Sequence, residues 1–335
     1  MSARSRSLVP LAVAAVLLLG ACGDPGSSAP TSGAGTGPTG PALDACEPIA
    51  GDELIVLADD LGLQTVDNIV PAVNADVAAE APGVLAVLDE VSATLDQDAL
   101  IALNRAVDVD RQTSSQVASG YLADTGLDGQ DQVGDGQSVL VGAANFSESA
   151  TLAEIYAGAL RAAGFDATTQ TIGNRETYAQ ALELGDLSVV PEYAGTLTEF
   201  LNITVNGPDA EPLASSDLDA TMAALTDLGA DVGLAFGTPA PAQNQNAFAV
   251  TLAFAEAYDV STLSQLAQTC GGIVLGGPPE CPERPFCRPG LEEVYGLQIE
   301  EFTSLDAGGP LTKAALTQGQ ITLGLVFSSD AALAG

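Results

Sequence analysis

The chain has 335 residues, of which nine are Lys or Arg and 44 are Asp or Glu, so its formal net charge is −35. This length is enough for two lobes with separate cores, and so acidic a body is excluded from electrostatic binding to nucleic acid or to anionic lipid headgroups. Histidine is absent, which excludes serine–histidine catalysis, histidine metal ligands and histidine pH switches. Gly-x-Ser-x-Gly and Walker motifs are missing too. We therefore predict no enzymatic activity, no cofactor and no metal.

The first residues predict a lipoprotein leader. A basic start is followed by the apolar run Leu8–Leu19 and by Leu-Gly-Ala-Cys, a bacterial lipobox that ends at Cys22. The apolar run is too short to span a bilayer. We expect residues 1–21 to be a signal peptide. Cys22 would then carry a lipid anchor at the extracytoplasmic face of the cell membrane. Residues 22–49 are expected to comprise this lipidated cysteine and a tether rich in Gly, Ser, Pro and Thr.

The next segment predicts a strand, a turn and three helices. The strand covers Glu53–Leu57, and an extended run follows at Val66–Val73. Asp59 and Asp60 are the kind of carboxylate pair that a hydrolase could use, but adjacent residues on a strand point to opposite faces, so we interpret them as part of a turn. Helical patterns follow at 83–94, 96–107 and 114–125. Residues 128–137 (DGQDQVGDGQ) lack apolar periodicity and predict a polar linker.

The segment from 138 to 203 predicts a βαβαβ unit. Its strands are expected at 139–142, 167–172 and 187–190, with one helix that starts at a Thr151/Glu154 capping box and ends at Gly164, and another between Asn174 and Gly185. Polar loops are expected after the first and third strands, at 145–149 and 191–196. In open parallel sheets, ligands bind beyond the carboxyl ends of the strands, so both loops are candidates for a binding site.

The remaining pattern continues the α/β alternation. It predicts helices at 216–228, 261–268 and 312–317, and a short helix that starts within 292–295. Strands are expected at 231–234, 272–275 and 321–326. A loop is expected over 239–251 and a polar turn at 328–330. No second apolar run is long enough to span a membrane.

Four cysteines remain besides Cys22. An exported protein favours disulfides, and four cysteines permit three pairings. The spacing of Cys281 and Cys287 favours a local loop, which leaves Cys46 with Cys270. A metal site is the competing interpretation, but it lacks histidine and a repeated Cys-x-x-Cys.

The βαβαβ segment also carries a family resemblance. VGAANFSESATLAEIYAGALRAAGF, followed by NRETYAQALELGDLSVVPEYAGT, resembles the substrate-binding proteins of quaternary-amine ABC importers, which take up glycine betaine, choline and carnitine. The resemblance implies a type II periplasmic-binding-protein fold, with two α/β lobes and an interlobe cleft. It also implies a small-molecule solute, an ABC permease as partner, and attachment to the membrane through the lipid anchor only.

The order of the resembling segments is unusual. In the family, a segment like LVFSSDAALAG is followed by one like ELIVLADDLGLQTVDNIVPAVN, which here lies at 53–74. Reading 138–335 and then 50–127 restores the family order, so the chain resembles a circular permutant whose linker, 128–137, bridges the family's termini. A truncated duplication would need repeated segments, and we find none. In this interpretation 50–127 and 138–245 form the first lobe, and 246–335 forms the second.

The resemblance also implies a binding site. A quaternary ammonium has no N–H to donate, so its recognition depends on aromatic faces. Tyr193 would be a cage wall and Arg284 would meet the ligand's carboxylate, with Arg288 as a weaker rival. The other candidates are Thr196, Asn246, Phe248, Phe327, Ser329 and Asp330, together with polar contacts from Asn145, Ser147, Gln64 and Asp67, for which an ordinary solvated loop is an equal alternative.

This sequence departs from the family pattern. Phe248 and Phe327 replace tyrosines that often wall the cage, and Asp67 falls where some members have an aromatic residue. Two alternatives therefore stay open: the same fold with a different small polar or aromatic solute, and a ligand-sensing or adaptor lipoprotein.

Overall fold

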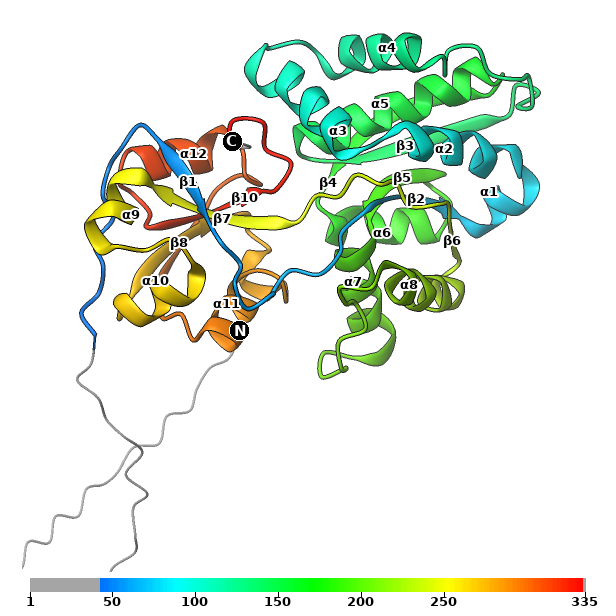
Figure 1. Cartoon of the computed structure of the whole chain (residues 1–335). Helices are drawn as coiled ribbons and strands as arrows, with labels where there is room; N and C mark the ends of the chain where they lie inside the picture. Colours follow the sequence, from blue (N-terminus) through cyan, green and yellow to red (C-terminus); the bar gives the residue numbers. More distant parts are fainter. Residues whose placement is uncertain (1–42, 334–335) are drawn as a thin grey trace, which may run out of the picture. The chain divides into compact units, whose positions relative to one another are not determined.

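The computed structural model describes residues 43–333, which contain two five-stranded sheets of orders β4-β3-β5-β2-β6 and β1-β7-β10-β8-β9 (Figure 1). We call the parts built on them the first and the second lobe. The predicted α/β fold with two lobes is confirmed. The predictions for the signal peptide, Cys22 and most of the tether lie outside the described residues. Within 43–333, no helix is long and apolar enough to cross a membrane.

The first lobe contains the predicted βαβαβ unit. Its strands β3 (Ser138–Ala144), β4 (Asp166–Gly173) and β5 (Val189–Tyr193) are parallel, and α5 (Ser147–Ala162) and α6 (Arg175–Glu183) connect them. Gly164 and Gly185 end these helices with φ of 90° and 79°, a conformation that favours glycine. The sheet as a whole is mixed, because β2 (Ile69–Asn74) runs antiparallel between β5 and β6 (Leu234–Phe236).

Helices cover both faces of the first sheet because successive strand residues point to opposite sides. Val139 and Val141 of β3 pack with α2 (Gly83–Thr94), α3 (Gln97–Asn104), α4 (Ser114–Thr125) and α5, whereas Leu140 packs with α6, α7 (Ala194–Asn206) and α8 (Leu218–Val232). The short α1 (Ala75–Glu80) follows β2 directly, and the π-helical turn η1 (Arg105–Val109) continues α3.

Both ends of the described chain contribute to the second sheet. β1 (Leu54–Leu57) and β10 (Leu323–Phe327) flank β7 (Asn246–Thr251), and both are antiparallel to it. Figure 1 shows blue β1 and red β10 beside yellow β7. The remaining elements are β8 (Ile273–Gly277), β9 (Ile299–Ser304), α9 (Leu252–Tyr258), α10 (Leu263–Thr269), the 3-10 turn η2 (Cys281–Glu283), α11 (Arg288–Tyr295) and α12 (Pro310–Thr317). The chain therefore passes between the lobes twice, over 58–68 and 237–245.

Four sequence predictions need correction. The start of 50–127 belongs to the second lobe, because β1 pairs with β7. The expected loop over 239–251 ends in β7, and the expected loop over 191–196 is the end of β5 and the first turn of α7. The Thr151/Glu154 capping box is wrong: α5 begins at Ser147, and the Thr151 hydroxyl donates to the Ser147 carbonyl at 2.8 Å. The strand expected at 231–234 is shifted, since α8 extends to Val232.

Other predictions are confirmed. The structure contains both disulfides, Cys46–Cys270 and Cys281–Cys287. Asp59 lies in a turn, where its carboxylate accepts the N–H groups of Leu63 and Gln64. Residues 128–137 form neither helix nor strand. This linker is nevertheless held in place, because the N–H groups of Val133 and Gly134 donate to the Ala163 carbonyl beyond the end of α5.

Candidate functional site

A cavity of about 260 Å³ is lined by residues of both lobes. Lining residues include the ends of β3, β5, β7 and β10 and the loop stiffened by the Cys281–Cys287 disulfide. Seven of the twelve predicted ligand-binding residues line it: Asp67, Asn145, Tyr193, Thr196, Asn246, Arg284 and Phe327. The structure therefore brings together residues as distant in sequence as Asp67 and Phe327.

One wall of the cavity is aromatic. Phe146 lies between Tyr193 and Phe327, with ring centroids 6.2 Å and 5.4 Å away, and its ring is tilted by 31° and 35° to theirs. Phe146 and Tyr193 come from the first lobe and Phe327 from the second. Tyr178, Phe200 and Phe286 also line the cavity. Faces of this kind attract a diffuse cation through the ring quadrupole.

A buried carboxylate fixes the orientation of Tyr193. Glu148, 4% exposed, accepts hydrogen bonds from the Tyr193 hydroxyl at 2.6 Å and from Asn244 Nδ2 at 2.8 Å on Oε1. Its Oε2 accepts from Asn104 Nδ2 at 2.6 Å and from the Ser329 hydroxyl at 2.7 Å. Burial and the charge of Glu148 raise the pKa of Tyr193, so the phenol stays a neutral donor.

Because Ser329 follows β10, the Glu148 network joins the two lobes. We expect Ser329→Ala to lower the free energy of unfolding by about 1.5–3 kcal/mol, since it removes a buried hydrogen bond to a charged group. Ser328→Ala is the matched control, because the neighbouring hydroxyl is exposed and, within residues 43–333, accepts only the Gln245 N–H. Urea denaturation of both variants measures the difference. Equal losses of unfolding free energy in the two variants would show that the hydrogen bond from Ser329 to Glu148 does not contribute to stability.

A buried ion pair lies behind the cavity wall. Arg175, at the start of α6, places Nε 3.0 Å from Glu192 Oε1 and Nη2 2.6 Å from Oε2, and the two side chains are 8% and 1% exposed. The Tyr178 hydroxyl donates to the same carboxylate at 2.7 Å. Burial opposes the charge on Arg175, but the charge and hydrogen bond of Glu192 raise its pKa overall. Arg175 therefore stays charged and is already paired with a carboxylate.

Arg175 connects this pair to a second buried carboxylate. Its Nη2 donates to Thr196 Oγ1 at 3.0 Å, and the Thr196 N–H donates to Asp67 Oδ1 at 2.9 Å. Asp67 thus caps the first turn of α7 from another segment of the chain. Burial raises the pKa of Asp67 to about 7, against the lowering effects of the Thr196 N–H and the Arg175 charge, while Glu192 raises it further.

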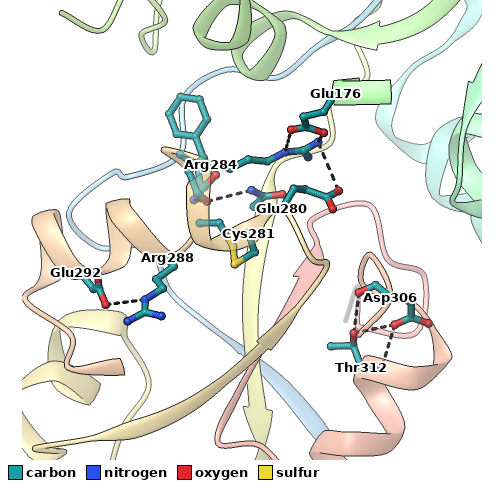
Figure 2. The surroundings of a disulfide bond; sticks show 12 residues. Glu176, Glu280, Cys281, Arg284, Arg288, Glu292, Asp306 and Thr312 are labelled. Carbon is teal, nitrogen blue, oxygen red and sulfur yellow. Dashed lines mark hydrogen bonds and ion pairs between the residues drawn. A yellow bond between two sulfur atoms is a disulfide. The ribbon is translucent and has the colours of Figure 1, made fainter. Parts of the chain in front are cut away.

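The loop between β8 and α11 carries Arg284 toward the first lobe. Its Nε and Nη2 lie 3.0 Å and 2.9 Å from the carboxylate of Glu176 on α6, and Nη2 lies 3.5 Å from Glu280 (Figure 2). Burial acts to raise the pKa of Glu176, but the hydrogen bond and charge of Arg284 lower it overall. Gln64 and Asn246 hold this loop, since both side-chain amides donate to the Phe286 carbonyl.

Five predicted residues do not line the cavity. Phe248 lies two residues further along β7 than Asn246 and is buried in the second-lobe core. Ser147 starts α5, Gln64 supports the Arg284 loop, Ser329 binds Glu148, and Asp330 pairs with Lys313. The rival Arg288 pairs with Glu292 on its own helix, and Figure 2 shows it away from Arg284.

Sequence reasoning missed five residues at or behind the cavity wall: Phe146, Glu148, Arg175, Tyr178 and Glu192. Phe146 and Glu148 lie within the NFSES segment, where only the small polar residues were selected. An aromatic residue in the short loop after a buried strand, one position beyond Asn145, was a usable signal for Phe146. Glu192 was not identified because it lies inside the strand β5, where a charged residue is unusual. Its partner Arg175 is 17 residues away in the sequence, so the pairing leaves no local pattern.

The chain matches a family model described as the substrate-binding domain of ABC-type glycine betaine transport systems, over residues 48–124 and 137–335. A solved structure described as the crystal structure of a glycine betaine/carnitine/choline ABC transporter is similar at 20% identity, with a TM-score of 0.38, over 58% of this chain and 71% of that one. The family match covers most of the chain and leaves out residues 1–47 and residues 125–136, which include nearly all of the 128–137 linker.

Proposed function

Because the chain belongs to the family of substrate-binding domains of glycine betaine ABC transporters, we propose that it binds a quaternary amine between its lobes and delivers it to an ABC permease. The proteins of this family bind solutes and are not enzymes. The observation that carries the proposal is the aromatic wall formed by Phe146, Tyr193 and Phe327, in a cavity that also contains carboxylates. This combination of ring faces and negative charge suits a cation that cannot donate hydrogen bonds.

The proposed ligand contacts follow from the cavity lining. Tyr193, Phe327 and Phe146 would surround the ammonium group, and Asp67 would add a negative charge near it. Thr196, Asn145 and Asn246 would supply polar contacts from three different segments. Closure of the lobes around the solute would desolvate these groups and strengthen their interactions.

We also propose that the chain is a circular permutant of its family. Two observations support this. Strands from both ends of the described chain, β1 and β10, flank the same strand β7. The two matched family segments are separated near the polar linker at 128–137, which would bridge the family's termini.

Attachment through a lipid on Cys22, at the extracytoplasmic face of the membrane, belongs to the same proposal and rests on the lipobox in the sequence. A ligand-sensing or adaptor lipoprotein would use the same cavity. Release of solute to a reconstituted permease, as opposed to stoichiometric retention, separates delivery from sensing.

A thermal-shift panel tests the solute class. A ligand that binds only the native state raises the melting temperature, by an amount that grows with its concentration above Kd. We expect choline, glycine betaine, carnitine or proline betaine to raise it, and non-amine controls such as glucose and sulfate to leave it unchanged. No response to any quaternary amine would reject the proposed solute class and leave the family and fold intact.

A further inference from the structure

We infer that the cavity selects a quaternary ammonium alcohol, a cation with a hydroxyl donor and no carboxylate, over a betaine. This inference rests on the proposed function and narrows it. A betaine and a cationic alcohol share the trimethylammonium group, which the aromatic wall would hold in either case. They differ at the other end, where a betaine offers only acceptors and a negative charge, and an alcohol offers a donor.

Both guanidinium groups in the described lining of the cavity are already paired with carboxylates. Arg175 and Arg284 are the cationic residues among its described lining, and each already meets carboxylate oxygens. Arg175 is paired with Glu192, and Arg284 lies between Glu176 and Glu280 (Figure 2). A ligand carboxylate would therefore meet an arginine whose charge is already balanced, and it would be repelled by the carboxylates beside that arginine.

The remaining charge of the lining is negative. Five carboxylates line the cavity: Asp67, Glu176, Glu199, Glu280 and Glu283. Asp67 is the most suitable for a cation, because within residues 43–333 the hydrogen bonds to its carboxylate, from the N–H and Oγ1 of Thr196, both end on Oδ1. Its Oδ2 is therefore available to a positive ligand, and the same carboxylate would repel a betaine's.

An unsatisfied acceptor also favours a donor on the ligand. Asn244 lines the cavity and is 4% exposed, and its Oδ1 is buried with no hydrogen-bond partner in the described part of the chain. The orientation of this amide is fixed, because its Nδ2 donates to Glu148, whose carboxylate only accepts. A buried acceptor without a donor is costly, so a ligand hydroxyl in reach of Oδ1 adds affinity that a betaine cannot supply.

Titration calorimetry of the purified full chain at pH 8 tests the preference with three probes. These are choline, glycine betaine and propyltrimethylammonium, which has a methyl group in place of the choline hydroxyl. We expect choline to bind about tenfold or more tightly than either of the other two, a difference of about 1.4 kcal/mol. Equal or tighter binding of glycine betaine overturns the inference but not the proposed function. Absence of binding by all three overturns the inference, and it overturns the proposed solute class as well if carnitine and proline betaine also fail to bind.

A gain-of-binding variant tests the role of the paired arginine. Glu176→Gln removes one of the two carboxylates beside Arg284, so we expect glycine betaine to bind several-fold more tightly and the preference for choline to narrow. Misfolding cannot produce such a gain. An unchanged ratio of the two affinities would show that the pairing of Arg284 does not exclude a carboxylate. Asp131→Asn, an exposed linker position, is the control for the change in net charge.

The pH dependence of choline binding tests Asp67. A cation favours the ionised carboxylate, so binding releases a proton, and choline affinity should rise as the pH increases through about 7 and level off above it. The charged groups that face Asp67 are Arg175 on α6 and Glu192 on β5, and these pair with one another. Asp67→Asn should remove this rise and weaken choline binding about tenfold at pH 8. A rise that persists in Asp67→Asn overturns the assignment.

Discussion

Arg175→Met is expected to lower the free energy of unfolding by about 3–5 kcal/mol, because it leaves the Glu192 carboxylate buried without its cation. Glu192 would keep the Tyr178 hydroxyl and the Tyr193 N–H, neither of which carries a charge. Arg161→Met is the matched control. Its partner Glu154 is 3.9 Å away and both side chains are solvated, so the expected loss is at most about 1 kcal/mol. Urea denaturation of both variants provides the comparison.

A double variant separates the charge effect from packing. Arg175→Met combined with Glu192→Leu removes both charges, and we expect it to recover much of the stability lost in Arg175→Met alone. If the double variant is as unstable as the single one, the isolated charge is not the cause. The Arg175 contact with Thr196 would then be the more important one.

The two disulfides should contribute unequally to stability. Cys46 and Cys270 are 224 residues apart, whereas Cys281 and Cys287 are six apart. Because the entropy removed from the unfolded chain grows with the closed loop, paired Cys→Ser substitutions should cost roughly 5 kcal/mol for the long loop and roughly 2 kcal/mol for the short one. Chemical denaturation of the two double variants measures both losses.

The reduced wild-type protein provides the control, since it should lose about the sum of the two contributions. Similar losses in the two double variants would contradict the loop-entropy account. That result would indicate that residual structure in the unfolded chain already keeps Cys46 near Cys270.

The sequence was most informative where periodicity was strong and long. The helices at 83–94 and 114–125 have the predicted bounds, and the βαβαβ unit was identified because Gly164 and Gly185 mark the ends of its helices. The 13-residue helix α7 was not predicted, because its first turn was interpreted as part of a polar loop. The missed helices α1 and α9 have six and seven residues, too few for a helical period to emerge. They depend on side-chain caps: Asn74 accepts the N–H groups of Asp76 and Val77, and Thr251 accepts that of Phe254.

The candidate site was predictable only in part, for a physical reason. Motif resemblance located Tyr193, Arg284 and Phe327, because each lies in a short segment of distinctive composition. The partners of these residues were not predictable, because they depend on contacts between distant segments. Glu176 pairs with Arg284 across 108 residues, and Glu148 meets Ser329 across 181. Phe248 was misplaced because two positions along β7 separate Asn246, which lines the cavity, from Phe248, which is buried in the second-lobe core.

The Cys46–Cys270 bond also determines where a mechanical load enters the molecule. Tension applied to the chain ahead of Leu43 reaches the Cys46–Cys270 bond before it reaches β1. The second lobe therefore bears the force through a covalent bond, and β1 is not pulled away from β7. With an anchor at Cys22, the second lobe would be the tethered body. The first lobe would then move relative to the second. It is attached through residues 58–68, residues 237–245 and the contacts across the cavity.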